Sequence, residues 1–421
     1  MSSNNKKALS SSWALAFTVA SVWFGTHVGG GFASGNQVII YFSQYGQLTS
    51  LIFPLCAMGI LAIVMHIWLK FARLNGFDNY KDTVSALYPS PKLEFLFEIF
   101  YIVIILAAVA AAVAGAGEVL ANFLSVPYVG AMKVVFNLLI VALLVLLSIF
   151  GVKLVAAAST VLSVAIMIIT GLMVIFGIAN AGMVDGLVKD FGIEGAAYTN
   201  DLGNSIWRGI FVYAAFQCVS IPPMIAASKD MNSKGTSRAC FLGWLMNGLA
   251  LGLSGFTLAK WYPLLMGLQQ KAVALQEAGK LAEGDALAKY LNATGIPNQT
   301  MLTLIGMKWL LAVFSVLLFC AFVSTCVTLI FTMVQRFAPK LAKLNNEGDF
   351  IRGIQNETLR RVIVAIVAIA VCFAISLLGL TNITKLLYGY DGYYALVVVV
   401  LPAFIFGIPK IKKLEAEGKK A

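Results

Sequence analysis

One stretch inside the first apolar segment decides the fold, Gly25-Thr26-His27-Val28-Gly29-Gly30-Gly31-Phe32-Ala33-Ser34-Gly35. Five of these eleven residues are glycine, and glycine loses more backbone entropy than any other residue when a helix forms. We therefore predict a helix that stops at Gly29 in a left-handed conformation and restarts at Ser34, with Ser34 and Gln37 as a capping box. Non-helical backbone at membrane depth survives only where it lines a cavity or is buried in protein. A broken helix of this kind points to a binding site.

The composition is that of an α-helical protein that crosses a membrane several times. The chain has 421 residues, of which 60% are hydrophobic and 12% are charged, and its mean hydropathy is +0.88. Each span needs about 20 apolar residues. The net charge of +11 lies mostly in short loops and tails, which indicates orientation in the membrane rather than nucleic-acid binding. The six cysteines lack metal spacing, and no nucleophile–base pair is evident, so we expect neither an enzyme nor a cofactor.

Ten spans are predicted, at 11–45 (broken), 49–73, 93–123, 128–150, 153–180, 204–229 (broken), 236–262, 301–335, 358–380 and 383–408. With ten spans, the lysine and arginine residues of the connections and tails all fall on one side, which places both termini in the cytoplasm. The sequence therefore predicts one membrane domain over 1–421.

The sixth span carries a second predicted interruption, over 217–223. Pro222 and Pro223 remove two backbone donors and are expected to push Ile221 out of the α region. The two broken spans are the first and the sixth, and this spacing is typical of an inverted repeat of five plus five spans, here 11–180 and 204–408.

The long outer connection at 263–300 has two interpretations. Its segment Gln269–Leu291 is predicted to form one or two short helices broken near Gly279 and Gly284. It is either a solvated cap or a lid over an outer vestibule, and we favour the lid.

Oxygen ligands for a cation are predicted in the eighth span. Ala321, Ser324 and Thr325 stand at i, i+3 and i+4, so they share one helix face. One carbonyl and two hydroxyls are hard ligands of the kind that Na⁺ favours. The alternative is that the two hydroxyls bond to their own helix or join helices together.

Ionisable residues inside spans are further candidates. His27 lies at the first break and is either a ligand for substrate or proton, or a neutral structural histidine. Glu118 either faces the vestibule or extends to the outer surface, and Asp391 is either a gating or proton group or part of an interfacial aromatic belt. At the second break, Phe216 and the polar residues Gln217 and Ser220 are candidate substrate contacts.

The run 29–37, followed by Tyr41-Phe42 and Tyr45-Gly46, resembles the YkvI-like bacterial membrane proteins. These belong to the amino acid–polyamine–organocation superfamily, with the LeuT-type fold. The resemblance covers nearly the whole chain, although its sharp motif is confined to the first span.

The resemblance implies a Na⁺ site between the first broken helix and span eight. The matching positions are Gly25, Val28, Ala321, Ser324 and Thr325. It also implies that the carboxylate end of a substrate is held at Thr26, His27, Gly29, Gly30 and Gly31. A half-helix that begins at Ser34 would aim free N–H groups at the same place. His27 departs from the small residue usual at its position.

The function expected from these observations is secondary active transport, a Na⁺-coupled symport of a small amino-acid-like solute. Proton coupling through His27, Glu118 or Asp391 is the alternative, and a channel or a non-transporting sensor is the alternative from another class. A channel would show a polar stripe through several spans, whereas polarity here clusters at two breaks. The expected partners are the solute and the lipid bilayer, with Na⁺ as coupling ion, and the sequence leaves the oligomeric state open.

Overall fold

The structure is a computed structural model that describes residues 11–150, 152–281, 285–342 and 356–419. Within these ranges the regular elements are helices, without a β-strand. Eight of the described helices are long and apolar enough to cross a membrane, and the bent pair 164–179 and 181–190 makes a ninth. Together with the broken first span, they correspond one to one with the ten predicted spans. The protein is therefore a multi-pass membrane protein.

The first span is broken where its glycines predict. It comprises α1 (Trp13–His27), α2 (Gly30–Ala33) and α3 (Asn36–Tyr41). Two details of the prediction are wrong. Gly29 is extended, with φ −78° and ψ 178°, and the left-handed glycine is Gly35, with φ 85°. Ser34 ends α2 instead of beginning α3, because its N–H bonds back to Gly30. Its hydroxyl accepts from the Asn36 N–H at 3.2 Å, so Ser34 and Gln37 form no capping box.

The sixth span keeps a helical path through its distortion. It runs through α10 (Leu202–Ile206), the π-helical η4 (Trp207–Val212), α11 (Tyr213–Phe216), the 3-10 turn η5 (Gln217–Ser220) and α12 (Ile221–Ala227). The 3-10 turn falls within the predicted interruption at 217–223, where the backbone tightens instead of unwinding, whereas the π-helical turn lies before it and was not predicted. The prediction that Ile221 leaves the α region is wrong, since its φ and ψ are −61° and −50°. Pro222 and Pro223 lie in the first turn of α12, where the N–H groups lack helical partners in any case.

The other spans are long single helices. They are α4 (Gln47–Asn75), α6 (Glu94–Phe123), α7 (Gly130–Phe150), α8 (Val152–Ala179), α13 (Ser233–Glu277), α15 (Lys308–Phe337), α16 (Glu357–Ser376) and α17 (Leu380–Ala395), which continues through π-helical turns into α18 (Ile408–Ala416). The predicted end of the seventh span at residue 262 is wrong, because α13 continues to Glu277. The first part of the expected lid helices, 269–277, is therefore an extension of the seventh span, which ends before Gly279 as predicted, whereas the predicted break near Gly284 lies outside the described residues.

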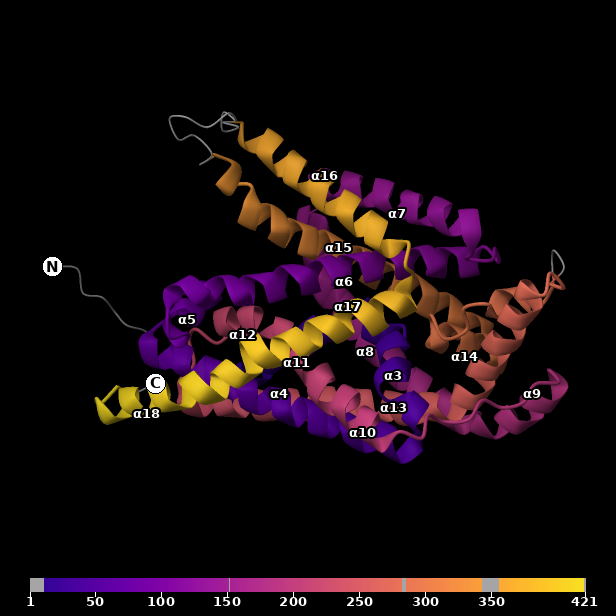
Figure 1. Cartoon of the computed structure of the whole chain (residues 1–421), viewed down its shortest axis with the longest axis horizontal. Coiled ribbons are helices and arrows are strands. Elements are labelled where there is room, and N and C mark those ends of the chain that lie inside the picture. The colour runs from indigo at the N-terminus through magenta and orange to yellow at the C-terminus, as the bar shows by residue number, and fades with distance from the viewer. Residues whose placement is uncertain (1–10, 151, 282–284, 343–355, 420–421) are drawn as a thin grey trace.

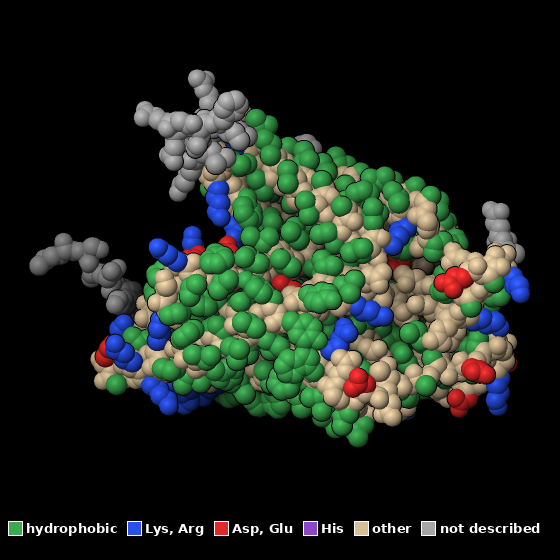
Figure 2. Space-filling view, in the orientation of Figure 1, with side chains coloured by type: hydrophobic (Ala, Val, Ile, Leu, Met, Phe, Trp, Pro, Cys, Tyr) green, Lys and Arg blue, Asp and Glu red, His purple; other side chains and the backbone are tan. Residues whose placement is uncertain are grey.

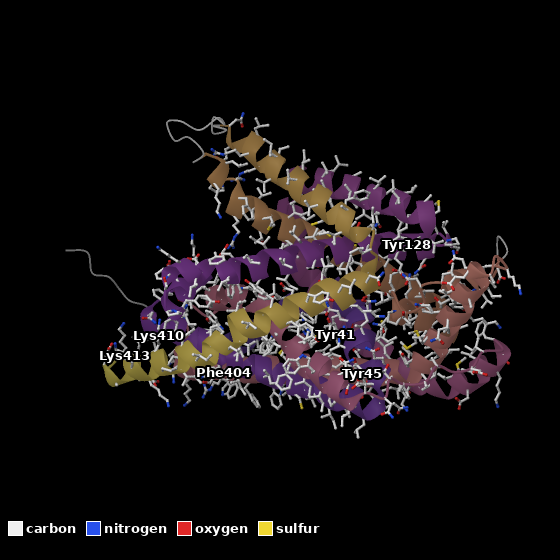
Figure 3. The ribbon with its side chains drawn as sticks, viewed as in Figure 1. Tyr41, Tyr45, Tyr128, Phe404, Lys410 and Lys413 are labelled. Carbon is white, nitrogen blue, oxygen red and sulfur yellow. The ribbon has the colours of Figure 1, made fainter. Side chains whose placement is uncertain are left out.

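The helices lie side by side in an elongated bundle (Figure 1). The short helices α5 (Tyr80–Leu87), α12 and α18 lie at one end, and α9 (Val184–Asp190) and α14 (Pro297–Ile305) lie at the other. Lys410 and Lys413 mark the first end, Tyr128 lies toward the second, and Tyr41 lies between them (Figure 3). Hydrophobic side chains cover the middle of the visible face, and lysine and arginine gather toward the ends (Figure 2). Such a surface is expected where lipid surrounds the middle.

Helices α4 and α13 approach each other closely because glycines on α13 face backbone atoms. A Cβ atom on Gly252 would lie 2.9 Å from the Leu51 carbonyl oxygen, and one on Gly255 would lie 2.6 Å from the Ser50 carbonyl oxygen. Small residues let membrane helices gain dispersion contacts that larger side chains would prevent.

We expect Gly255→Ala to destabilise the protein by about 1–3 kcal/mol, because its methyl group would force α4 and α13 apart. The measurement is thermal unfolding in detergent. Gly171→Ala on α8 is the matched control, since a Cβ there meets nothing within 4 Å. Equal melting temperatures for the two variants would contradict this account of the packing.

Candidate functional site

The first break leaves backbone carbonyls of α1 without helical partners. Val28 donates its N–H to Phe24 at 2.8 Å, and the chain then turns away from the helix axis. Within the described ranges, no backbone N–H donates to the carbonyl oxygens of Gly25 or Val28. Carbonyl oxygens without a helical donor can accept from another group, so these oxygens are suited to a ligand from outside the chain.

The eighth span meets this break through hydroxyl side chains. A Cβ placed on Gly29 would lie 4.0 Å from the Thr325 Oγ1, so α2 and α15 touch at this level. Ser324 Oγ lies 3.4 Å from the Ala321 carbonyl oxygen, which is a long distance for a hydrogen bond. Thr325 donates no hydrogen bond to any described residue. The alternative interpretation is that both hydroxyls bond to carbonyls of their own helix. Ser324 makes only a long contact of that kind, and Thr325 makes none.

His27 lies at the end of α1 and joins three spans. Its side chain is only 4% exposed. Its Nδ1 lies 2.6 Å from Asn247 Oδ1 on α13, and its Nε2 lies 2.9 Å from the Tyr213 hydroxyl on α11. Tyr213 in turn lies 3.5 Å from Gln37 Oε1 and 3.5 Å from Gln217 Nε2. The break, the sixth span and the seventh span thus share one buried polar network.

The hydrogen bonds of this network show which ring nitrogen of His27 carries a hydrogen. Asn247 donates from Nδ2 to the Gly243 carbonyl at 2.8 Å, so its Oδ1 is the acceptor that faces His27, and His27 Nδ1 carries a hydrogen. In a neutral imidazole, Nε2 then accepts from the Tyr213 hydroxyl. In an imidazolium, Nε2 donates to Tyr213, and the Tyr213 hydroxyl is free to turn toward Gln37. The network has partners for either protonation state.

The other predicted substrate residues divide into two groups. Thr26 is exposed, and its hydroxyl donates to the Val22 carbonyl at 2.8 Å, so it stands outside the buried network. Phe216 and Ser220 are fully buried. The Phe216 ring packs against the Tyr41 and Tyr213 rings at centroid distances of 5.3 and 4.9 Å. The Ser220 hydroxyl has no partner among the described residues.

Amide side chains bind the outer loop to the second half of the break. Asn298 on α14 donates from Nδ2 to the Ala33 carbonyl at 2.9 Å and from its backbone N–H to the Ser34 carbonyl at 3.2 Å. Asn36 donates to the Thr294 carbonyl at 3.1 Å. These contacts place the segment around α14 directly over the break, as the lid interpretation expects.

Three of these amide residues were missed as candidates on sequence. Asn36, Asn247 and Asn298 are each 4% exposed or less. The available signal is their type, because a polar amide inside an apolar segment requires a partner. Their partners lie far away along the chain, so no local pattern identifies them.

We expect Asn298→Ala to loosen the lid, because the Ala33 carbonyl would lose its donor. Amide hydrogen exchange of 32–36 and 294–299 should accelerate about ten-fold, which corresponds to ~1.4 kcal/mol. Asn180→Ala is the matched control, since Asn180 bonds only to the Phe176 carbonyl of its own helix. Unchanged exchange in the Asn298 variant would show that the lid is held by other contacts.

The two candidate carboxylic acids lie in separate places. Glu118 on α6 is 1% exposed. Its Oε1 lies 2.4 Å from where a Cβ on Gly295 would be, so the lid segment covers it, and its side chain bonds to Asn292. Asp391 lies on α17 and is 4% exposed. Glu118 Oε2 and Asp391 Oδ2 have no partner among the described residues.

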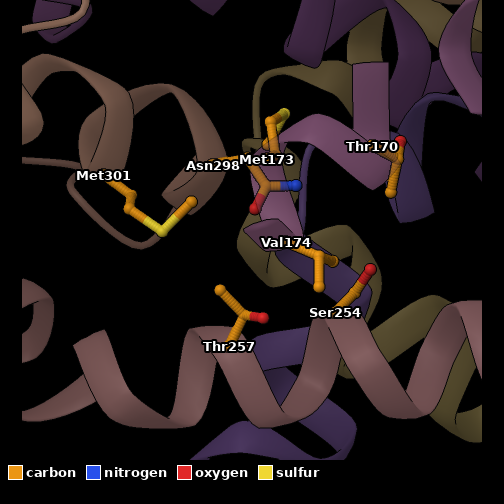
Figure 4. A pocket seen from close by; sticks show the side chains of 7 residues that line it. All are labelled: Thr170, Met173, Val174, Ser254, Thr257, Asn298 and Met301. Atoms are coloured by element: carbon orange, nitrogen blue, oxygen red, sulfur yellow. The ribbon is translucent and has the colours of Figure 1, made fainter. Parts of the chain in front are cut away.

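A small cavity lies beneath the lid, between α8, α13 and α14 (Figure 4). Its volume is about 10 Å³, close to the minimum for one water. Thr170 and Ser254 line it with hydroxyls that have no partner among the described residues. Polar lining of this kind suits an internal water.

The comparisons with known proteins identify the fold. A scan against protein-family models and a search of curated proteins give no match. Among solved structures, the chain is similar to MhsT in its crystal structure with L-phenylalanine, with a TM-score of 0.56 and 12% identity over 97% of this chain and 99% of that chain. The chain is an all-α membrane protein of the LeuT-type fold. Its assignment to the YkvI-like group stays a prediction.

Proposed function

We propose that this protein is a secondary active transporter that carries a small amino-acid-like solute in symport with Na⁺ across the cytoplasmic membrane of a prokaryote. The observation that carries the proposal is the first break, where the carbonyls of Gly25 and Val28 lack backbone donors and the next residue, Gly29, lies beside Thr325. The LeuT-type fold supports it. The complex of MhsT with L-phenylalanine supports the solute class, with the lipid bilayer as the expected surroundings.

The proposed cation ligands are the carbonyls of Gly25, Val28 and Ala321 and the hydroxyls of Ser324 and Thr325. Oxygen ligands of a cation the size of Ca²⁺ lie at about 2.3–2.6 Å, and Na⁺ has nearly the same radius. Two ligands about 2.4 Å from one ion and at a right angle are ~3.4 Å apart. The Ala321 carbonyl and Ser324 hydroxyl oxygens lie 3.4 Å apart, which suits ligation better than a mutual hydrogen bond.

The proposed solute site is the backbone around Gly29, Gly30 and Gly31 with the polar network of His27 and Gln217. Backbone N–H groups exposed by the break suit a carboxylate. The aromatic ring of Phe216 and the hydroxyl of Ser220 complete the proposed set on the sixth span. A buried hydroxyl without a partner, as at Ser220, favours a polar group on the solute.

The proposal is tested by uptake of radiolabelled amino acids into proteoliposomes under an inward Na⁺ gradient. We expect accumulation that collapses by at least about ten-fold when choline replaces Na⁺ on both sides. Uptake at the full rate in choline would refute the Na⁺ coupling. Failure of every amino acid to accumulate under both Na⁺ and proton gradients would refute the function.

Proton coupling is the second candidate, and one observation favours it. His27 has a hydrogen-bond partner for its neutral and for its charged form, in a network that spans three helices. Accumulation driven by an inward proton gradient in Na⁺-free buffer would identify this mechanism. Glu118 and Asp391, each with an oxygen that lacks a partner among the described residues, are the further candidates for carrying the proton.

A further inference from the structure

The aromatic ring of Phe322 fills the space between the first break and the third span. Phe322 is fully buried and stands on α15 between Ala321 and Ser324. A Cβ on Gly30 would lie 2.0 Å from the ring carbon Cδ1, and a Cβ on Gly115 of α6 would lie 2.2 Å from Cζ. The two glycines therefore border the ring from two different helices.

The backbone conformation does not require glycine at position 30 or at position 115. Gly30 and Gly115 are both helical, and neither is among the glycines with positive φ. Glycine inside a helix costs about 0.5–1 kcal/mol relative to alanine. The absence of a side chain at these two positions is therefore explained by the room that the ring occupies.

These contacts differ from ordinary close packing of membrane helices. On α13, Gly252 and Gly255 face carbonyl oxygens of α4, and a backbone cannot leave its place without moving a whole helix. Gly30 and Gly115 face a side chain, which can leave by rotating about its own bonds. A substitution of Phe322 can therefore empty the space beside the break without moving a helix.

The position of this space connects it to the proposed solute site. Gly30 is the first residue of α2. Gly29, directly before it, lies beside Thr325 of the proposed cation site. The wall on α6 is apolar, since Gly115 lies within the buried run Ala110–Ala116. A solute held at the break by its carboxylate would direct its side chain toward apolar walls rather than toward a charge.

We propose that Phe322 sets the size limit of the transported solute. Its ring takes up the apolar end of the solute site, so that the protein accepts amino acids with small side chains, such as alanine, and excludes those with ring-sized side chains. This inference rests on the proposed function, because it concerns the solute of that site. Removing the ring leaves a cavity between two glycines, which have no side chains to fill it.

The experiment measures binding of L-alanine and L-phenylalanine to the purified full-length protein by thermal shift in saturating NaCl. For the wild type we expect L-phenylalanine to require at least about ten-fold more ligand than L-alanine for half-maximal stabilisation. Phe322→Ala should reverse this preference, and Phe322→Leu should reduce it. Phe314→Ala, which removes another buried ring from the same helix, should leave the ratio unchanged.

The outcomes separate the inference from the function on which it rests. Binding of both amino acids with the same ratio in the wild type and in Phe322→Ala would overturn the size limit and leave the proposed function in place. If Phe322→Ala does not fold, an unchanged ratio in Phe322→Leu would overturn it equally. Binding of neither amino acid by any of the proteins would overturn this inference, because alanine would not be accepted, whereas the proposed function would fall only if no amino acid accumulates in the uptake experiment.

Discussion

Replacing His27 by alanine is expected to lower uptake by about 30-fold or more. The variant would leave two buried partners unsatisfied, the Asn247 oxygen and the Tyr213 hydroxyl, which lie 2.6 and 2.9 Å from the imidazole. Each unsatisfied group costs ~1–3 kcal/mol, and each 1.4 kcal/mol is a factor of ten. The cost falls on the network that fixes the break against the sixth and seventh spans. The measurement is initial uptake into proteoliposomes, normalised to folded protein.

A conservative substitution distinguishes the two roles of His27. Glutamine can hydrogen-bond to neighbouring side chains but does not titrate. If His27 only positions the break, His27→Gln should recover much of the uptake lost in His27→Ala. If His27 carries the coupled proton, His27→Gln should remain inactive in a proton gradient. Ser21→Ala is the matched control on the same helix, since Ser21 bonds only to the Phe17 carbonyl. Wild-type uptake by His27→Ala, with unchanged pH dependence, would show that transport depends on neither role of His27.

Features that depend on local backbone energy were predictable from the sequence. The glycines of 25–35 lower the cost of leaving the helix, and the chain does leave it at Gly29 and at Gly35, on either side of the short helix α2. The placement of Ala321, Ser324 and Thr325 on one face follows from helical periodicity alone.

Features that depend on where an element begins were not predictable. Pro222 and Pro223 strongly disturb a helix interior but are tolerated in a first turn, and the sequence does not say that α12 starts at Ile221. The left-handed glycine is Gly35 rather than Gly29 because α2 makes one further turn between them. The helix α13 passes residue 262 because Pro263 is accommodated within it.

The hydrogen-bond partners of the site residues were not predictable from the sequence for another reason. His27 and Asn247 are separated by 220 positions, and Asn36 and Thr294 by 258. Such pairs arise from the packing of whole spans, which a single sequence does not encode in any local pattern. The placement of the Phe322 ring against Gly30 and Gly115 is of the same kind.

Thr325→Ala is expected to raise the Na⁺ concentration for half-maximal uptake by about ten-fold, and Ser324→Ala by less. The reason for the difference lies in the bonds that each hydroxyl makes. Ser324 has a weak alternative partner in the Ala321 carbonyl at 3.4 Å, whereas Thr325 donates to no described residue and lies beside Gly29. Removing the hydroxyl that is free for an ion should cost more. Thr332→Ala is the matched control, because Thr332 bonds to the Thr328 carbonyl of its own helix at 3.0 Å.

The same measurement separates an ion ligand from a substrate contact. A coupled ion acts on transport by favouring one conformation, with a coupling energy of typically ~1–3 kcal/mol. At saturating Na⁺ the site is filled even in a weakened variant, so solute affinity there should change much less than the half-maximal Na⁺ concentration. If Thr325→Ala instead weakens the solute at every Na⁺ concentration, Thr325 contacts the solute. If neither variant alters the Na⁺ dependence, the cation binds elsewhere, and the free carbonyls of Gly25 and Val28 require another partner.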